Sequence, residues 1–130
     1  MFATVRRLLL PAALVPLACL LAVPRPAGAD NFGPSHYDPA TDEIVITMLY
    51  GGTNANHTFT IKWGTCEVDD SGRRMPLVNA DVLDDQFNDI EQQQYKIVVH
   101  LSLAGMPCAR PAIVTLSSPP GSSIRLVIPK

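Results

Sequence analysis

The residues best suited to chemistry in this chain form an acidic run between positions 84 and 91. Five oxygen-bearing side chains fall within eight positions there: Asp84, Asp85, Asn88, Asp89 and Glu91. Calcium takes six to eight oxygen ligands, so the run is a candidate calcium site. However, its spacing is not that of an EF-hand, and no glycine supplies the sharp turn. Acids at the start of a helical turn also cap it and complement its dipole, and we favour this capping role.

The histidines are a second candidate set of ligands, in this case for zinc. The chain has three of them, His36, His57 and His100. They lie in separate segments and lack the i, i+4 or H-x-H spacing that places two imidazoles on one metal. We therefore expect each histidine to be exposed or to make a single hydrogen bond.

No residue pattern indicates catalysis. The chain has no G-x-S-x-G elbow, phosphate loop, redox C-x-x-C motif or dinucleotide fingerprint. Ser102 and His100 are two apart on a predicted strand and point the same way, as polar pairs on a solvent face commonly do. Adjacent acids such as Asp69 and Asp70 are ordinary in turns, and glycosidase carboxylates also need a cleft. We expect neither enzyme activity nor a cofactor.

The two cysteines beyond the first thirty residues are expected to pair. Cys66 and Cys108 are the even pair that remains once Cys19 is removed with a leader. Exported chains meet an oxidising compartment, where lone cysteines form disulfides. Closing a loop of about 43 residues would stabilise the fold by roughly 4 kcal/mol in the chain-entropy model.

The first 29 residues have the three parts of a secretory signal peptide. Arg6 and Arg7 form a basic start, residues 8–23 are apolar, and Ala27-Gly28-Ala29 is a small-residue end. We predict cleavage after Ala29 and a periplasmic or secreted protein. A membrane-spanning helix, lipidation at Cys19 and a twin-arginine signal remain as alternatives.

Removal of this leader makes the protein acidic. All 12 acidic residues remain, but only 7 of the 10 basic residues do, which gives a net charge of −5. An acidic domain lacks the electrostatic footprint for nucleic acid or anionic lipid. The expected partner is therefore an unknown protein or small ligand.

The strand expected over 57–63 is the anchor of the predicted fold. Its apolar residues Phe59, Ile61 and Trp63 alternate with polar ones, the period of a half-buried strand. The tryptophan is expected to be buried close to the disulfide. A hairpin is predicted between this strand and the preceding one, 43–50.

The remaining pattern is that of a single all-β domain. Strands are predicted over 43–50, 57–63, 77–83, 95–103, 112–117 and 123–128, with one short helical turn within 84–94. The prolines of residues 30–42 predict an irregular N-terminal arm. Residues 43–130 are predicted to form the domain. Six short strands joined by turn residues favour a small antiparallel β-sandwich.

Two resemblances follow from these residues. The architecture resembles an immunoglobulin-like sandwich, although Trp63 precedes the first cysteine instead of lying between the two. Ile97 also stands where the cysteine after a tyrosine corner at Tyr95 would be. The stretch 37–66, followed by 82–103 and Cys108, resembles short exported bacterial proteins without an assigned function. That resemblance implies export and a single domain.

We therefore expect a non-enzymatic binding or structural module that presents a loop from a stapled scaffold. The surfaces named for this role are 51–56, 69–74 and 84–91. The first choice within them is the run Gly51, Gly52, Thr53 and Asn54, whose composition also suits a plain hairpin connection. An exported inhibitor of a hydrolase and a calcium- or zinc-binding module are the alternatives.

Overall fold

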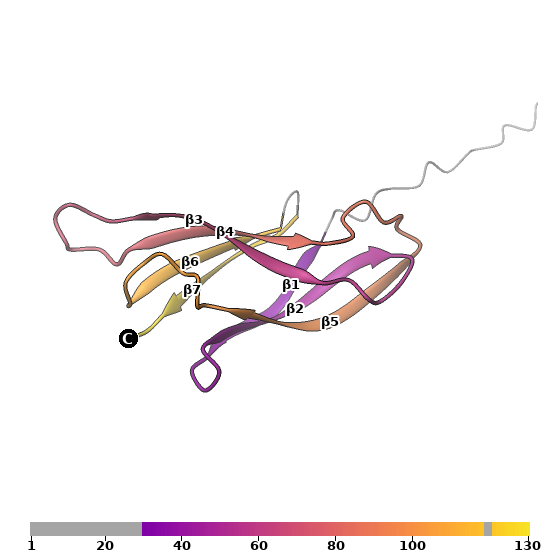
Figure 1. Ribbon diagram of the computed structural model, residues 1–130, viewed down its shortest axis with the longest axis horizontal. Helices are drawn as coiled ribbons and strands as arrows, with labels where there is room; N and C mark the ends of the chain where they lie inside the picture. The colour runs from indigo at the N-terminus through magenta and orange to yellow at the C-terminus, as the bar shows by residue number, and fades with distance from the viewer. Residues whose placement is uncertain (1–29, 119–120) are drawn as a thin grey trace, which may run out of the picture.

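The computed structural model describes residues 30–118 and 121–130, so the predicted leader 1–29 and Cys19 lie outside the described residues. The described chain is all-β, without a helix (Figure 1). Its seven strands are β1 (Asn31–Asp38), β2 (Glu43–Gly52), β3 (Phe59–Glu67), β4 (Leu77–Asp84), β5 (Gln93–Ser102), β6 (Ala112–Ser117) and β7 (Ser123–Ile128). Within these residues no helix has the length and apolar character needed to cross a membrane.

The strands form two sheets that lie over one another as layers (Figure 1). One sheet has the order β1-β2-β5 and is antiparallel throughout. The other has the order β3-β4-β6-β7, and its central pair β4 and β6 runs parallel. The prediction of wholly antiparallel sheets is wrong at this pair. β5 separates β4 from β6 in sequence but belongs to the opposite sheet, so the chain re-enters the second sheet in its original direction.

The core lies between the two layers and is filled by alternate residues of the central strands. In β2 the residues Ile44, Ile46, Met48 and Tyr50 are fully buried. Every second residue of a strand points to the same face, so this face of β2 meets the inward faces of β4 and β6. Those faces contribute Val78, Ala80, Val82, Ala112, Val114 and Leu116. The six strands predicted from sequence are all present, and β6 and β7 have the predicted bounds.

The predicted irregular arm is wrong, because most of it forms the edge strand β1. This strand pairs with β2 from Asp38 opposite Glu43 to Asn31 opposite Leu49. Its register shifts between Phe32 and Ser35, the stretch that holds Pro34. Proline lacks a backbone N–H and is tolerated at bulges and on edge strands, so its presence does not end the strand.

The segment after β4 is also not helical. Residues 85–88 form hydrogen-bonded turns, with the backbone N–H of Asp89 donating to the oxygen of Gln86 over 2.8 Å. The predicted helical turn is absent from the described residues. The segment's polar side chains instead bond to the connection between β2 and β3.

The predicted hairpin between β2 and β3 is wrong as well. β2 already has neighbours on both sides, β1 and β5. The connection after Gly52 therefore carries the chain across to the other sheet, where β3 pairs with β4. This crossing places the 53–58 connection at one end of the molecule, next to the turn that follows β4.

The predicted disulfide is present. Cys66 and Cys108 are bonded, with their Cα atoms 5.2 Å apart, and the link ties the end of β3 to the segment between β5 and β6. Trp63 is half-buried against the core. Its ring lies against Gly105, where a Cβ atom would approach two ring atoms to 3.2 Å. The tryptophan thus packs against the segment between β5 and β6 that holds Cys108, but it is less buried than predicted.

Candidate functional site

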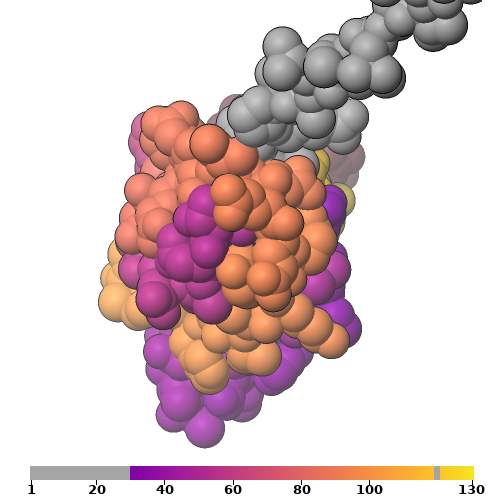
Figure 2. Space-filling view, turned by 90° about the vertical axis from the view of Figure 1, so that its right-hand side faces the viewer, coloured from indigo at the N-terminus to yellow at the C-terminus, as the bar shows by residue number. Residues whose placement is uncertain are grey.

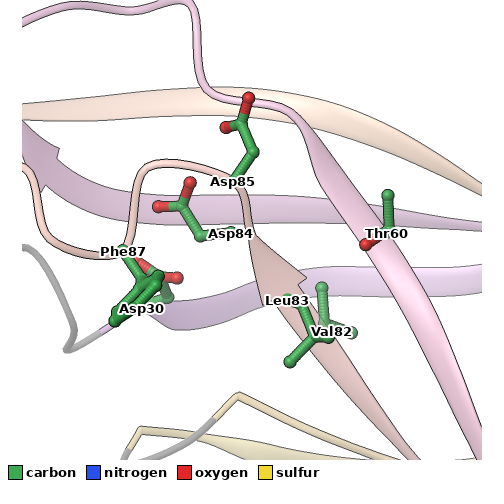
Figure 3. A pocket seen from close by; sticks show the side chains of 7 residues that line it. All are labelled: Asp30, Thr60, Val82, Leu83, Asp84, Asp85 and Phe87. Carbon is green, nitrogen blue, oxygen red and sulfur yellow. The ribbon is translucent and has the colours of Figure 1, made fainter.

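The candidate site is a cavity of about 520 Å³ at the end of the molecule where β4 finishes. Its described lining comes from the residue before β1, from β3, from β4 and from the turn after β4 (Figure 3). The lining residues are Asp30, Thr60, Val82, Leu83, Asp84, Asp85 and Phe87. Acids and apolar side chains thus share one concave surface.

A buried histidine lies behind the cavity wall. The side chain of His57 is fully buried, and its Nδ1 is 2.7 Å from Oδ2 of Asp84. Its Nε2 is 3.1 Å from Oδ2 of Asp89. The ring packs on Tyr50, with the ring centroids 4.6 Å apart. The prediction of an exposed or singly bonded histidine is wrong for His57, because two distant acids converge on it.

This arrangement favours the charged imidazolium. Burial alone would lower the pKa of His57, but the hydrogen bonds and charges of Asp84 and Asp89 outweigh it and raise the pKa above its ordinary value. Both ring nitrogens can donate only in the protonated form. Since both are engaged by carboxylates, neither is available as a base toward a molecule in the cavity.

Asp89 joins the histidine to the first-choice binding loop. Its carboxylate accepts hydrogen bonds from the backbone N–H of Thr53 at 2.7 Å and from the Thr53 hydroxyl at 2.8 Å. The Thr53 N–H in particular lowers the pKa of Asp89, and the Thr53 hydroxyl and His57 add to the effect. Asn54 donates to Oε1 of Gln86 at 3.0 Å. The side chains of Thr53 and Asn54 are therefore used to fix the loop.

The two glycines of that loop are buried at the end of β2. A Cβ on Gly52 would lie 2.8 Å from both Oδ2 of Asp89 and Nε2 of His57, so the network requires glycine there. Gly51 is covered by the side chain of Glu91. These contacts, and not the conformational needs of a hairpin, explain the run of glycines. Figure 2 shows the 53–58 connection and the segment between β4 and β5 side by side on this end of the molecule.

The acidic run does not converge on a metal position. Asp84 and Asp89 are bonded to His57, and Asp85 accepts the backbone N–H of Thr58 at 2.7 Å. Glu91 accepts from Gln94, and Asn88 is exposed. No group of three His, Cys, Asp or Glu side chains in residues 30–118 and 121–130 could hold a metal ion. The predicted capping role also fails in its detail, since these acids cap loops instead of a helix.

The other two histidines lie away from this network. His36 is on the exposed side of β1. His100 lies on β5, with Nδ1 3.0 Å from Oε2 of Glu43, and more than half of its side chain is exposed. The three histidines therefore do not form a shared zinc site.

Sequence reasoning missed the most unusual residue of the cavity, Asp30. It is 4% exposed, and its buried Oδ1 has no hydrogen-bond partner in the described part of the chain. Burial raises the pKa of this carboxyl to about 6, and the charge of Asp84 adds to the increase while His57 opposes it. No local pattern marks Asp30, because it lies at the start of a polar segment and the cavity that it lines is formed with residues of β3 and β4, which are distant in sequence.

The opposite end of the molecule carries arginines. The hairpin that joins β3 to β4 projects from the body (Figure 1), and Arg73 and Arg74 at its tip are exposed. The loop is held by Asp69, whose carboxylate accepts the Ser71 hydroxyl at 2.6 Å, and by Gly72, which adopts a φ of 66°. A hollow of about 310 Å³ lies between this tip and the Ala109–Pro111 region.

No family model, curated protein or solved structure matches this chain.

Proposed function

We propose that this protein is an exported, disulfide-stabilised binding module that holds its ligand in the cavity lined by Asp30. It is cleaved after Ala29 and works in the periplasm or outside the cell as a single domain. The observation that carries the proposal is a buried carboxyl oxygen, Oδ1 of Asp30, that has no hydrogen-bond partner among the described residues and lies in the wall of a cavity of about 520 Å³. Concave, mostly apolar surfaces with a few converging polar groups are the usual form of ligand sites.

We assign the fold to the β-sandwiches, with an immunoglobulin-like arrangement that departs from the usual one. The support is two facing sheets, the β1-β2-β5 order and a tryptophan near the disulfide. The departure is the parallel pairing of β4 with β6, since immunoglobulin sheets are antiparallel. On such a scaffold, ligands commonly bind at one end of the two sheets, where the loops gather.

Binding is favoured over catalysis because His57 and the acids bonded to it are already engaged in hydrogen bonds with one another and with the backbone. His57 has both nitrogens engaged, and Asp84 uses one oxygen for His57 and the other for the backbone N–H of Gln86. The only hydroxyl among the described lining residues is that of Thr60, and no base is bonded to it there. The cavity thus offers recognition groups without an activated nucleophile.

Mapping of small probes by NMR tests this proposal. Benzyl alcohol, benzylamine and phenylacetate would each be titrated into the isotope-labelled protein. We expect at least one probe to shift the amide signals of Thr60, Leu83 and Phe87 as a group and to saturate. Absence of any saturable shift at these amides with all three probes would contradict a ligand site in the cavity.

A second candidate function, inhibition of a hydrolase, is supported by the projecting hairpin. Arg73 and Arg74 are exposed on a loop that Asp69 holds in shape, as a trypsin-like protease would require of an inhibitor. Titration of trypsin would distinguish two outcomes. An inhibitor blocks the enzyme stoichiometrically and stays intact, whereas an ordinary exposed loop is cut after one of the arginines.

A further inference from the structure

One oxygen of the Asp30 carboxyl, Oδ1, is buried and has no hydrogen-bond partner among residues 30–118 and 121–130. Buried side-chain oxygens are hydrogen-bonded in the great majority of cases, because an unpaired one loses its water without compensation. Asp30 lacks this compensation at Oδ1 in the described chain, although Ser122 and Gly121 pack around its backbone oxygen. Its side chain lines the cavity (Figure 3). A group entering the cavity could therefore supply the missing partner.

The charges around Asp30 indicate whether the ligand group that enters the cavity is positive or negative. Asp84 and Asp85 line the same cavity, and the described lining contains no lysine, arginine or histidine. The positive charge of His57 is already matched by Asp84 and Asp89. In the protein cleaved after Ala29, the α-ammonium of Asp30 adds one positive charge near the cavity. The carboxylates of Asp30, Asp84 and Asp85 outnumber it, so the cavity stays negative and favours a cation over a neutral or anionic group.

The rest of the wall indicates what the cation is attached to. Val82 belongs to the hydrophobic core, while Leu83 and Phe87 are 41% and 61% exposed. Exposed apolar side chains around a carboxyl suit a cation that carries a hydrocarbon part, which would remove them from water. The Phe87 ring can also interact with a cation through its face.

We propose that the Asp30 cavity binds an organic cation, an alkylammonium or guanidinium group carried on an apolar chain, with Asp30 as its carboxylate partner. This inference rests on the proposed function and specifies its ligand class. The same chemistry occurs in small amines and in the lysine or arginine side chains of a polypeptide, which include the Arg73–Arg74 tip of a second copy of this chain.

Calorimetric titration of the purified protein with three matched compounds tests the ligand class. Benzylamine should bind at least tenfold more tightly than benzyl alcohol, and phenylacetate more weakly than both. Equal binding of benzyl alcohol and benzylamine would overturn the cation site while leaving the proposed ligand cavity intact. Absence of binding by all three would overturn both.

Two variants test the role of Asp30. In Asp30→Asn the affinity for benzylamine should fall at least tenfold, while the affinity for benzyl alcohol stays unchanged. Asp81→Asn is the matched control, because Asp81 lies on β4 but does not line the cavity. A thermal melt of each variant verifies that it is folded. Unchanged benzylamine affinity in folded Asp30→Asn would overturn the proposal.

Two further arms identify the source of the cation. Acetyl-Leu-Arg-amide is compared with the same peptide containing citrulline, which is uncharged. A tenfold preference for arginine that disappears in Asp30→Asn supports a polypeptide ligand, and benzylamine binding without that preference supports a small amine. Sedimentation measures self-association of the wild type, of Asp30→Asn and of the double variant Arg73→Ala/Arg74→Ala. If the wild type self-associates and both variants do not, the cation comes from a second copy of the chain.

Discussion

The two ends of the molecule hold their functional groups in opposite ways. At the cavity end, the buried His57 is bonded to Asp84 and Asp89 from distant segments, and Oδ1 of Asp30 has no hydrogen-bond partner within the part of the chain that the structure describes. At the hairpin end, Arg73 and Arg74 are exposed, and the loop is held by local bonds to Asp69. Buried ionisable groups are expensive unless paired, whereas exposed ones cost little. Stability should therefore respond strongly to changes at the cavity end and weakly to changes at the hairpin tip.

Each end is also stabilised by a different kind of interaction, which we call its brace. The disulfide Cys66–Cys108 fixes the base of the β3–β4 hairpin, and the Asp84–His57–Asp89 network fixes the loops around the cavity. One brace is covalent and independent of pH. The other consists of charges, so its strength depends on protonation. Removing each brace in turn tests whether the two ends differ in this way.

Loss of the disulfide should have the largest effect. In Cys66→Ala/Cys108→Ala the free energy of unfolding should fall by roughly 4 kcal/mol, because the loop closed over a separation of 42 residues is released. Urea denaturation measures this loss. Hydrogen exchange should show β3 and β4 opening first, with the 53–58 connection still protected. A loss below about 1 kcal/mol would contradict the covalent brace.

Removal of the buried imidazole should rank second. His57→Gln leaves Asp84 buried without its charged partner and should reduce the free energy of unfolding by about 3 kcal/mol near pH 6. The pKa of His57 is raised, so its stabilisation is complete below about 6.5, the ordinary value, and is lost as pH rises through the raised pKa. The difference between wild type and variant should therefore shrink in alkaline solution.

Urea denaturation at several pH values follows this difference, with His100→Gln as the control. His100 lies on an exposed face, and its substitution should change stability by no more than about 0.5 kcal/mol. Equal small effects of both substitutions would show that the network does not brace the cavity end.

Neutralising Asp30 should stabilise the protein. Its pKa is raised from 3.8 to about 6, so the folded state holds the proton to higher pH than the unfolded state does. Stability is thus lost as pH rises through this window, and the loss is complete above it. Asp30→Asn should gain about 2 kcal/mol at pH 7 and nothing at pH 3. Thermal melts at both values measure the gain, and a destabilised variant at pH 7 would contradict this interpretation.

Changes at the hairpin tip should have the smallest effect. Arg73→Ala/Arg74→Ala removes two exposed side chains that form no ion pair within the described residues, so the free energy of unfolding should change by less than about 0.5 kcal/mol. Urea denaturation of this variant and of Asp30→Asn under the same conditions compares the two free energies of unfolding directly. A large loss here would mean that the two ends do not differ in the way proposed.

Most of the strands could be predicted from sequence because their signal is local. The alternation in β5, from Tyr95 to Leu101, and in β3, from Phe59 to Trp63, records which side chains face the core. β1 was missed because Pro34 is a breaker in most contexts but is accommodated at a bulge on an edge strand. The parallel β4–β6 pair could not be predicted, since it depends on which sheet receives β5.

The site was predictable only in fragments. The 51–56 and 84–91 segments were both named as binding surfaces, but nothing in either shows that they meet. They are joined through His57, which is 27 residues from Asp84 and 32 from Asp89 in sequence. Two of the acids that suggested calcium, Asp84 and Asp89, instead neutralise a buried imidazolium. Asp30 was predicted to lie in an irregular arm, because a cavity formed with residues of β3 and β4 leaves no signature in the local sequence.

The most direct test of the central claim is the pKa of the Asp30 carboxyl, followed by carbon-detected NMR with and without benzylamine. The account predicts a midpoint of about 6 in the unliganded protein. It also predicts a clear decrease when benzylamine is bound, because a cation beside the carboxyl favours the ionised form. A midpoint near the ordinary value of 3.8 that benzylamine leaves unchanged would contradict it.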